Sequence, residues 1–596
     1  MAVRRGANCL RKAIEYERGC WFDWSAMPGR FKVFRQCFVF VLIFSSLALL
    51  LNRGEVARAQ TSTGARTWFI RPDGGDRKQC TGKTDAAYRG KGTAQPCAFK
   101  HPYYLFTTDE YNNKQWVVEG GDTILIHGGP YRMGYRGPNA NDMWGSCPGD
   151  PYSCSMPPIP SGTPGHPTRL LGEQHGSCKQ KTQLFGGYAL GAIIALQGSK
   201  NVEIECLELT DHGQCTRAGA GYPASEGCST SYPLSDFASS GIVTDAGTAN
   251  ITLRDLDIHG LVSRGIIGPV GGEIVAERVR IAFNGLAGWD FDDGAGTRSG
   301  ENASVKASYL TVEWNGCNEE YPIRHEIPVF SCFDQDHGGY GDGVGTPGTP
   351  LNFSCDHCTF RYNTQDGFDL LHTSGSLISI TNSISQGNMG QQWKMGAMRK
   401  VLFQNNLTVH NCKRMSAPMK GAPDNYNRYL SLYCRAGGDG IAFNISDGGI
   451  YVLQNNSFAG YGSTSYDISC SGSCSTANIV YQNNLNIGIK SPIDGNKPGV
   501  FYLSDVPRGV AMSFDHNIYY EMRTCPSGRT ERCVDPKIVN LPEWKGESSL
   551  DSIDLHLTSG SPARGAGVAV QGMTADYDGL PRPGGAVDIG AFQYKP

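Results

Sequence analysis

Three short segments between residues 341 and 394 carry the residue types best suited to chemistry. They read GDGVG from Gly341, QDGFD from Gln365 and GQQWK from Gly390, so equivalent positions recur after 24 and 25 residues. The segments differ mainly at charged positions, where they supply three carboxylates and one amine: Asp342, Asp366, Asp369 and Lys394. Carboxylates that hold a divalent cation beside an amine base are the groups needed to remove a proton next to a carboxylate.

The repeat interval predicts how these residues are brought together. Self-similarity at a fixed interval of roughly 20–50 residues is typical of solenoids. If each interval is one turn of a parallel β-helix, equivalent positions lie about 4.8 Å apart, the spacing of hydrogen-bonded strands. We therefore predict an all-β fold, a parallel β-helix with long disulfide-tied loops, whose coil places the three aspartates and Lys394 on one face.

Calcium is the cation that such a cluster favours, because it takes six to eight oxygen ligands, carboxylates above all. Without a cation, neighbouring carboxylates raise one another's pKa. Lys394 has an ordinary pKa of about 10.4, and an adjacent dication with partial burial would lower it into the range of a usable base. Two plainer interpretations stay open: Asp-Gly pairs that only form turns, and a Lys394–Asp369 surface salt bridge.

These motifs resemble the calcium-dependent pectate lyases of polysaccharide lyase family 9. The matches are Asp342-Gly343, the QDGFD segment, and WKMG from Trp393. The resemblance implies a right-handed parallel β-helix in which Asp342, Asp366 and Asp369 bind calcium and Lys394 is the Brønsted base. This sequence departs from the family at Gln365, where the family has a first paired aspartate. A glutamine oxygen still ligates calcium but brings no charge, so we keep Gln365 among the predicted metal ligands.

The reaction that the resemblance implies is β-elimination in a uronic-acid polymer, with loss of the proton on C5 and cleavage of the C4–O bond. Homogalacturonan is the implied polymer, and alginate, other uronans and bacterial exopolysaccharides stay open. Arg399, Lys400 and Arg435 lie in or just beyond the same turns, and we predict that they bind further carboxylates of the substrate. The alternative interpretation is that these three residues are solvated surface charges that do not bind substrate.

Two further groups of acidic residues lie outside the cluster. Asp290, Asp292 and Asp293 precede it by about two turns and would line a sugar subsite, hold a second calcium, or form a solvent-facing turn. Asp334, Asp336 and His337 lie on an insertion over residues 314–340, where they would form a lid.

The rest of the chain supports the coil and suggests its limits. Strand-like alternation recurs from Ala192 onward, and Asn382, Asn405, Asn455 and Asn483 occupy equivalent structural positions. Residues 136–190 are rich in Gly, Pro, Ser and Cys and predict a long loop. We divide the chain into residues 1–59, an N-terminal entry with its loop at 60–190, a coil core at 191–510 and a C-terminal capping segment at 511–596.

The N-terminus and the cysteines predict an exported protein. Residues 33–51 are apolar, follow basic residues and precede Ala57-Arg58-Ala59, which is typical of a signal peptide cut after residue 59, with an uncleaved anchor as the alternative. Eighteen of the 21 cysteines lie beyond residue 59 and predict disulfides. The CDHC segment from Cys355 is only half of a zinc motif, and no second half has suitable spacing.

The net charge of the chain limits which classes of molecule it can bind. Residues 1–59 carry ten Lys or Arg and four Asp or Glu, so the remainder of a chain with net charge −3 carries −9. Such a protein is a poor partner for nucleic acid, and an anionic polysaccharide would need local cations or a bound metal. We expect a secreted, periplasmic or cell-surface monomer without stable membrane insertion. A glycoside hydrolase on the same scaffold and a noncatalytic adhesin are the alternative functions.

Overall fold

The computed structural model describes residues 64–108, 114–135, 154–213, 236–292, 297–317, 341–345, 350–410, 439–490, 495–543 and 551–596. The predicted signal segment, the lid residues Asp334, Asp336 and His337, and Arg435 lie outside these ranges. The chain divides at Gly64, and Ala65–Pro596 forms one unit. Within the described residues no α-helix occurs, and no helix is long and apolar enough to cross a membrane.

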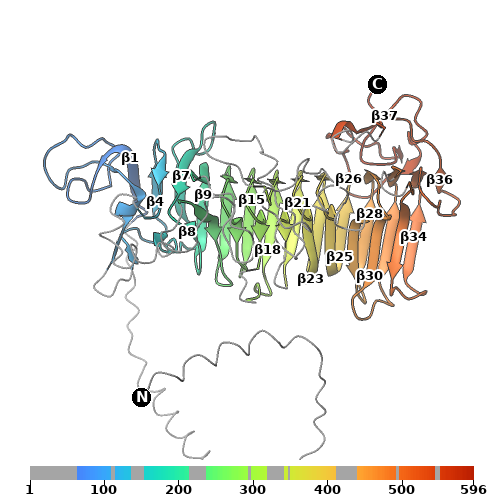
Figure 1. Cartoon of the computed structure of the whole chain (residues 1–596), viewed down its shortest axis with the longest axis horizontal. Helices are drawn as coiled ribbons and strands as arrows, with labels where there is room; N and C mark the ends of the chain where they lie inside the picture. The colour runs from blue at the N-terminus through green and yellow to red at the C-terminus, as the bar shows by residue number, and fades with distance from the viewer. Residues whose placement is uncertain are drawn as a thin grey trace, which may run out of the picture. The chain divides into compact units, whose positions relative to one another are not determined.

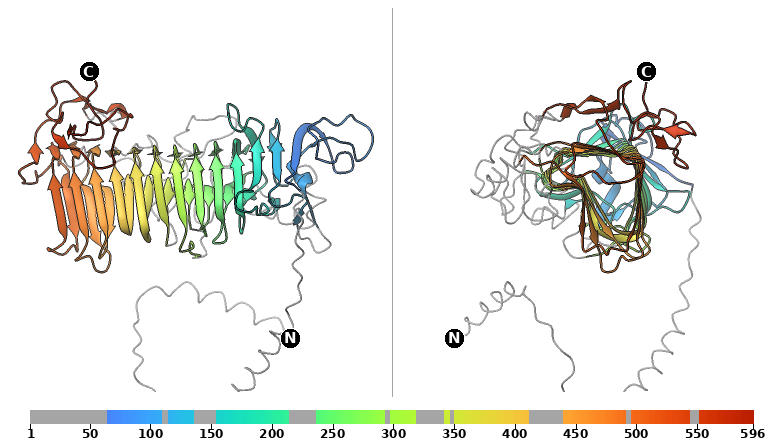
Figure 2. Two further views of the ribbon diagram at one scale, coloured as in Figure 1. Left: turned by 180° about the vertical axis from the view of Figure 1, so that it is seen from behind. Right: turned by 90° about the vertical axis from the view of Figure 1, so that its right-hand side faces the viewer.

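The unit is a right-handed parallel β-helix, as predicted, whose turns stack along one axis (Figure 1). Seen along that axis, three faces enclose the core (Figure 2). The first face, which carries the acidic segments, consists of β8 (Leu190–Ala195), β11 (Ala238–Val243), β14 (Arg264–Ile267), β17 (Trp289–Asp290), β20 (Val344–Gly345), the start of β23 (Phe368–Thr381), the start of β25 (Trp393–Gln404), β27 (Asp439–Ile445), β30 (Thr464–Cys470) and β33 (Gly499–Ser504).

The second face continues from the first around a bend, and β23 and β25 run through both, so the two faces count as one sheet of 21 strands. Its further strands are β1 (Thr67–Gly75), β4 (Thr123–Ile126), β6 (Thr168–Gly172), β9 (Lys200–Glu205), β12 (Ala249–Arg254), β15 (Glu273–Glu277), β18 (Ser304–Ser308), β21 (Asn352–Asp356), β28 (Ile450–Gln454), β31 (Asn478–Gln482) and β34 (Ala511–Asp515).

The third face is a sheet of 13 short strands. They are β5 (Tyr131–Arg132), β7 (Thr182–Gly186), β10 (Leu207–Asp211), β13 (Asp257–His259), β16 (Arg280–Ala282), β19 (Thr311–Glu313), β22 (Thr359–Arg361), β24 (Ile384–Gln386), β26 (Leu407–His410), β29 (Ser457–Gly460), β32 (Leu485–Gly488), β35 (Ile518–Tyr520) and β36 (Arg532–Cys533). Outside the coil lie the 3-10 helix η1 (Pro102–Leu105) and the pairs β2 (Phe106–Thr108) with β3 (Lys114–Trp116), β37 (Ile538–Asn540) with β38 (Asp554–Leu557), and β39 (Gly567–Val568) with β40 (Ala586–Val587).

The expected loop over residues 136–190 is in part regular structure. Its described portion contains β6 and β7, whose alternate residues are buried in the coil. Glycines and prolines around these strands hid the alternation, because each strand is only five residues long. The parallel stack therefore starts at β1, well before residue 191.

Asparagines stabilise the bends between faces two and three. The four predicted equivalent residues all have left-handed backbone angles, and Asn405 donates to Asn382 at 2.6 Å while Asn483 donates to Asn455 at 3.1 Å. The predicted register is thus confirmed. A second row, which the sequence did not reveal, lies one residue further on and is fully buried: Asn406, Asn456, Asn484 and Asn517.

Disulfides join cysteines that are close in sequence, as the composition predicted. Pairs with both cysteines among the described residues are Cys80–Cys97, Cys178–Cys206, Cys355–Cys358, Cys470–Cys474 and Cys525–Cys533. Because Cys355 and Cys358 are bonded to each other, the half zinc motif has no thiolates to offer a metal.

The C-terminal segment packs differently from the expected end cap. Residues 511–533 still contribute strands to the coil, and the later residues lie along its flank over several turns. Arg582 is buried there and donates to the Asn405 side chain at 2.7 Å and to the carbonyls of Gly590 and Ala591. His556 lies between Asp554 and Asp578, at 2.5 and 2.8 Å, and stacks on Phe592.

Candidate functional site

The core of the coil aligns the candidate site. Val344, Phe368 and Trp393 pair in register on successive turns, and all three side chains are fully buried. Alternate residues of a strand point to opposite sides, so the next residue on each turn points outward. Those outward positions hold Gly345, Asp369 and Lys394, and Asp369 is paired with Lys394.

Asp342 and Asp366 occupy the turn just before these strands. Asp342 Oδ1 accepts the backbone N–H of Asp366 at 2.9 Å, and Asp366 Oδ1 accepts the N–H of Gln391 on the following turn at 2.6 Å. Each aspartate is therefore fixed by the next turn of the coil. This leaves the second oxygen of each carboxylate available for other contacts.

Lys394 bridges two of the three acids. Its Nζ lies 2.6 Å from Asp366 Oδ2 and 2.9 Å from Asp369 Oδ2. Asp369 is oriented by its other oxygen, which accepts the N–H of Leu371 at 3.0 Å. One oxygen from each of Asp342, Asp366 and Asp369 lies within 4.8 Å of the others. The coil thus brings together all four residues of the predicted cluster.

Two buried oxygens at the site have no hydrogen-bond partner: Asp342 Oδ2 and Gln365 Oε1. Both residues are 1% exposed. A buried polar oxygen without a partner costs about 1–3 kcal/mol, so such atoms call for an explanation. Convergent oxygens with unused lone pairs are the donor set that a hard cation takes.

The pKa shifts of Asp342 and Lys394 reflect the crowding of three carboxylates at a buried site. Burial and the neighbouring Asp366 and Asp369 carboxylates raise the pKa of Asp342 well above its ordinary range. Burial alone would lower the pKa of Lys394, but the three carboxylates outweigh it and hold that pKa well above its ordinary value. In this arrangement the lysine is an ammonium donor. We expected a low pKa for Lys394 beside a bound dication. That expectation concerns the cation-bound site, whose charges differ from those of the carboxylates alone.

Space at the site is preserved by a glycine. A Cβ built on Gly345 would lie 2.6 Å from Asp342 Oδ2, closer than a carbon and an oxygen can approach. Neighbouring turns carry Asp290 and Asp369 at the equivalent position. The three converging carboxylates, the unpartnered Asp342 oxygen and this space fit a divalent cation held by Asp342, Asp366 and Asp369. Gln365, which directly precedes Asp366, stays a predicted ligand.

The predicted substrate-binding residues lie further along β25. Arg399 and Lys400 are exposed, and within the described residues neither side chain has an ion-pair or hydrogen-bond partner. They follow the shift in strand register between the first and second faces, at Leu370/Ser374 of the paired strand. They are therefore beyond the bend from Lys394.

Asp290 lies on the same outward column, one turn before Gly345. Its Oδ2 accepts from Arg264 Nε at 2.6 Å, and burial raises its pKa despite that guanidinium. Asp292 donates its backbone N–H to Asp290, and Asp293 lies outside the described residues. An acid already paired with arginine is a weaker candidate for a second calcium site.

One further acid, which the sequence motifs did not single out, lies on the other side of the cluster. Asp467 occupies the outward column two turns after Lys394, with Ala442 between them. Its Oδ1 is buried without a partner, and burial together with Asp439 raises its pKa. The alternation of the TSYDISC strand is the signal that could have identified it as outward.

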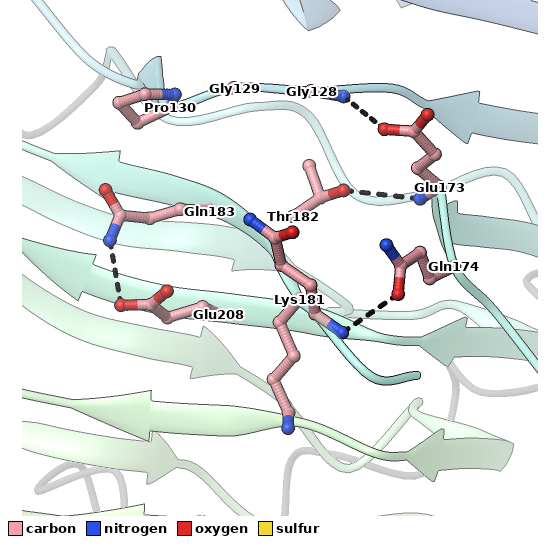
Figure 3. Close-up of a pocket in the computed structure, with 10 residues that line it drawn as sticks. Gly128, Gly129, Pro130, Glu173, Gln174, Lys181, Thr182, Gln183 and Glu208 are labelled. Carbon is pink, nitrogen blue, oxygen red and sulfur yellow. Dashed lines mark hydrogen bonds between the residues drawn. The ribbon is translucent and has the colours of Figure 1, made fainter. Parts of the chain in front are cut away.

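A separate cavity of about 310 Å³ lies among the N-terminal turns, against Gly128, Glu173 and Thr182 (Figure 3). Its polar groups bond one another: Glu173 accepts from the Gly128 N–H, and Gln183 donates to Glu208 at 2.8 Å. This cavity has neither converging carboxylates nor an unpartnered oxygen of a lining residue, so the Asp–Lys cluster is the better candidate.

Comparison with known proteins identifies similar solved structures but no family. No family model and no curated protein matches the chain. The chain is similar to pectate lyase Pel9A (13% identity over 89% of this chain and 97% of that one, TM-score 0.35) and to a rhamnogalacturonan lyase (13%, 83% and 97%, 0.32). It is also similar to the A-module of the Azotobacter vinelandii mannuronan C-5 epimerase AlgE4 (12%, 66% and 89%, 0.28). Similarities of this size do not bear on activity, and the fold rests on the strand pairing itself.

Proposed function

We propose that this protein is a secreted polysaccharide lyase that cleaves a uronic-acid polymer by calcium-assisted β-elimination. The observation that carries the proposal is the convergence of Asp342, Asp366 and Asp369 beside Lys394, with a buried Asp342 oxygen left unpartnered. Disulfides support export. The resemblance of the three motifs to calcium-dependent pectate lyases supports the same conclusion.

Asp342, Gln365, Asp366 and Asp369 would hold the calcium. When bound, calcium supplies positive charge that neutralises a uronate carboxylate and makes the adjacent C5 proton more acidic. Lys394, whose amine lies beside these carboxylates, would take that proton. The electrons of the C5–H bond form the C4–C5 double bond as the C4–O bond breaks, and the leaving oxygen takes a proton from solvent.

Lys394 must be neutral for this role, and the structure suggests how the site can achieve that. Burial favours the neutral amine, while only the surrounding carboxylates favour the ammonium. Once those carboxylates are engaged by another positive charge, they no longer stabilise the ammonium, and burial then lowers the lysine pKa.

The test is to incubate metal-stripped protein with polygalacturonate, alginate and other uronans, with and without calcium, while following the ultraviolet absorbance of unsaturated products. We expect absorbance only with calcium, and its loss in Lys394→Ala but not in Lys200→Ala, which changes an exposed lysine on β9. New reducing ends without absorbance, insensitive to chelator, would instead indicate a glycoside hydrolase. Absence of any cleavage would indicate a noncatalytic surface protein.

A further inference from the structure

A groove on the third face, outside the Asp–Lys cluster, combines aromatic rings with guanidinium groups. It is a shallow, open depression of about 430 Å³ lined by Asp257, Arg280, Phe283, Glu313, Trp314 and Arg361. The groove lies where β16, β19 and β22 end, just before the turns that lead back to the first face. The β22 turn leads from Tyr362 to Gln365 and Asp366 within four residues.

Aromatic residues occupy one structural position on three successive turns. Phe283, Trp314 and Tyr362 each follow the last residue of a third-face strand and have φ angles of 54°, 56° and 59°. The flanking turns have glycine there, Gly260 and Gly387, with φ angles of 70° and 65°. Bulky residues rarely adopt this left-handed conformation, so three consecutive turns of this kind carry backbone strain.

The three rings form a continuous stack. Phe283 and Trp314 have centroids 6.3 Å apart and planes within 6°, and Trp314 and Tyr362 have centroids 4.7 Å apart. Arg280 lies over Phe283 at 5.4 Å, and Arg361 lies over Tyr362 at 5.6 Å. Phe283 is only 3% exposed, so the half-buried Trp314 and Tyr362 are the rings that a ligand can reach, mainly along their edges.

The charges of the groove are organised around one buried acid. Glu313 accepts from Arg280 Nε at 2.8 Å and from Arg361 Nε at 2.7 Å, and Arg280 also pairs with Asp257. Arg361 remains 44% exposed, and among the described residues its Nη nitrogens have no partner. A guanidinium held by its Nε presents the two Nη donors to a ligand in the geometry that matches a carboxylate.

We propose that this groove binds a segment of the acidic polysaccharide at a distance from the bond that is cleaved. Arg361 pairs with a uronate carboxylate through its Nη donors, and the edges of the Trp314 and Tyr362 rings offer the sugar rings an apolar surface. The identity of the polymer rests on the proposed function, but the groove itself does not depend on catalysis.

The test is affinity electrophoresis of the full protein through gels containing polygalacturonate, in EDTA to suppress cleavage, with dextran as a neutral control. We expect Trp314→Ala and Arg361→Gln each to weaken retardation about tenfold, with Trp314→Phe and Lys200→Ala close to wild type. Unchanged circular dichroism and thermal unfolding would show that the variants are folded. Unchanged retardation in both groove variants, or no retardation of the wild type, would overturn the inference.

These outcomes separate the two proposals. If groove variants lose binding while no uronan yields an unsaturated product, the groove stands and the lyase proposal fails. If unsaturated products form with calcium while both groove variants bind as the wild type does, the groove proposal fails alone. Equal retardation by dextran would mean that the groove does not select for a carboxylate. That result would also overturn the assignment to an acidic polymer.

Discussion

Replacing Lys394 by methionine tests whether the amine and a cation share the same oxygens. Methionine keeps most of the side-chain volume and removes the charge. We expect calcium to bind more tightly to Lys394→Met than to the wild type, although the variant should have lost its activity. A base that is lost usually costs a factor of about 10²–10⁴ in rate.

The size of the effect follows from the distances. The amine lies 2.6 and 2.9 Å from two of the oxygens, and calcium binds carboxylate oxygens at about 2.3–2.6 Å, so amine and ion lie within about 5 Å of each other. The repulsion between a dication and an ammonium at that distance is about 1.7 kcal/mol at the dielectric constant of water, and larger in a buried site. The amine can swing toward solvent, so we take this lower bound and expect about a tenfold gain in affinity.

The unliganded variant should be less stable, since its buried carboxylates lose their counterion. Breaking a buried ion pair costs about 3–5 kcal/mol, and calcium should restore most of the loss. Calorimetric titration of metal-stripped protein measures the affinity, and thermal unfolding with and without calcium measures the stability, with Lys200→Met as the control. Calcium affinity that is unchanged or weaker in Lys394→Met would refute the shared-oxygen arrangement.

Four further changes follow from the structure. Gly345→Ala places a methyl group against Asp342 Oδ2 and should weaken calcium binding about tenfold in the same titration, with little loss of fold. Gln365→Asp adds a charge to the site and should tighten calcium binding while lowering the unfolding temperature in EDTA; looser binding would remove Gln365 from the ligand set. Arg582→Met leaves buried carbonyls unpaired and should cost about 2–5 kcal/mol, visible as early proteolysis of the C-terminal segment. Burial lowers the pKa of His556, but its two aspartate partners raise it above the ordinary value of 6.5, so its stabilising contribution should be complete below pH 6.5 and lost as pH rises through the raised pKa. His556→Gln should abolish that slope in pH-dependent thermal unfolding.

Much of the fold could be predicted from the periodicity of the sequence. A repeat of 24 and 25 residues aligned Asp369 with Lys394, and the strand pairing bears out that register. The aligned asparagines predicted the same stacking from independent positions, and Asn405 bonds Asn382 while Asn483 bonds Asn455. Repeats of this kind succeed because each turn contacts only its neighbours, so local sequence determines most contacts.

The aromatic groove and the flank of the C-terminal segment could not be predicted in the same way. Phe283, Trp314 and Tyr362 are separated by 31 and 48 residues, because an insertion hides their common position. Arg582 reaches Asn405 across 177 residues of sequence, and no periodicity connects them. Contacts of that kind depend on how the finished coil presents its surface.

The sequence by itself determined the coil, its winding register and the identity of the four charged residues that the coil brings together. Only the tertiary structure decided how their charges are shared. Lys394 is within reach of two carboxylates, and burial with those carboxylates sets the protonation of the amine and of Asp342. The physical reason is that alignment follows from local spacing, whereas pKa values and unpartnered oxygens depend on burial, which every neighbouring turn contributes to.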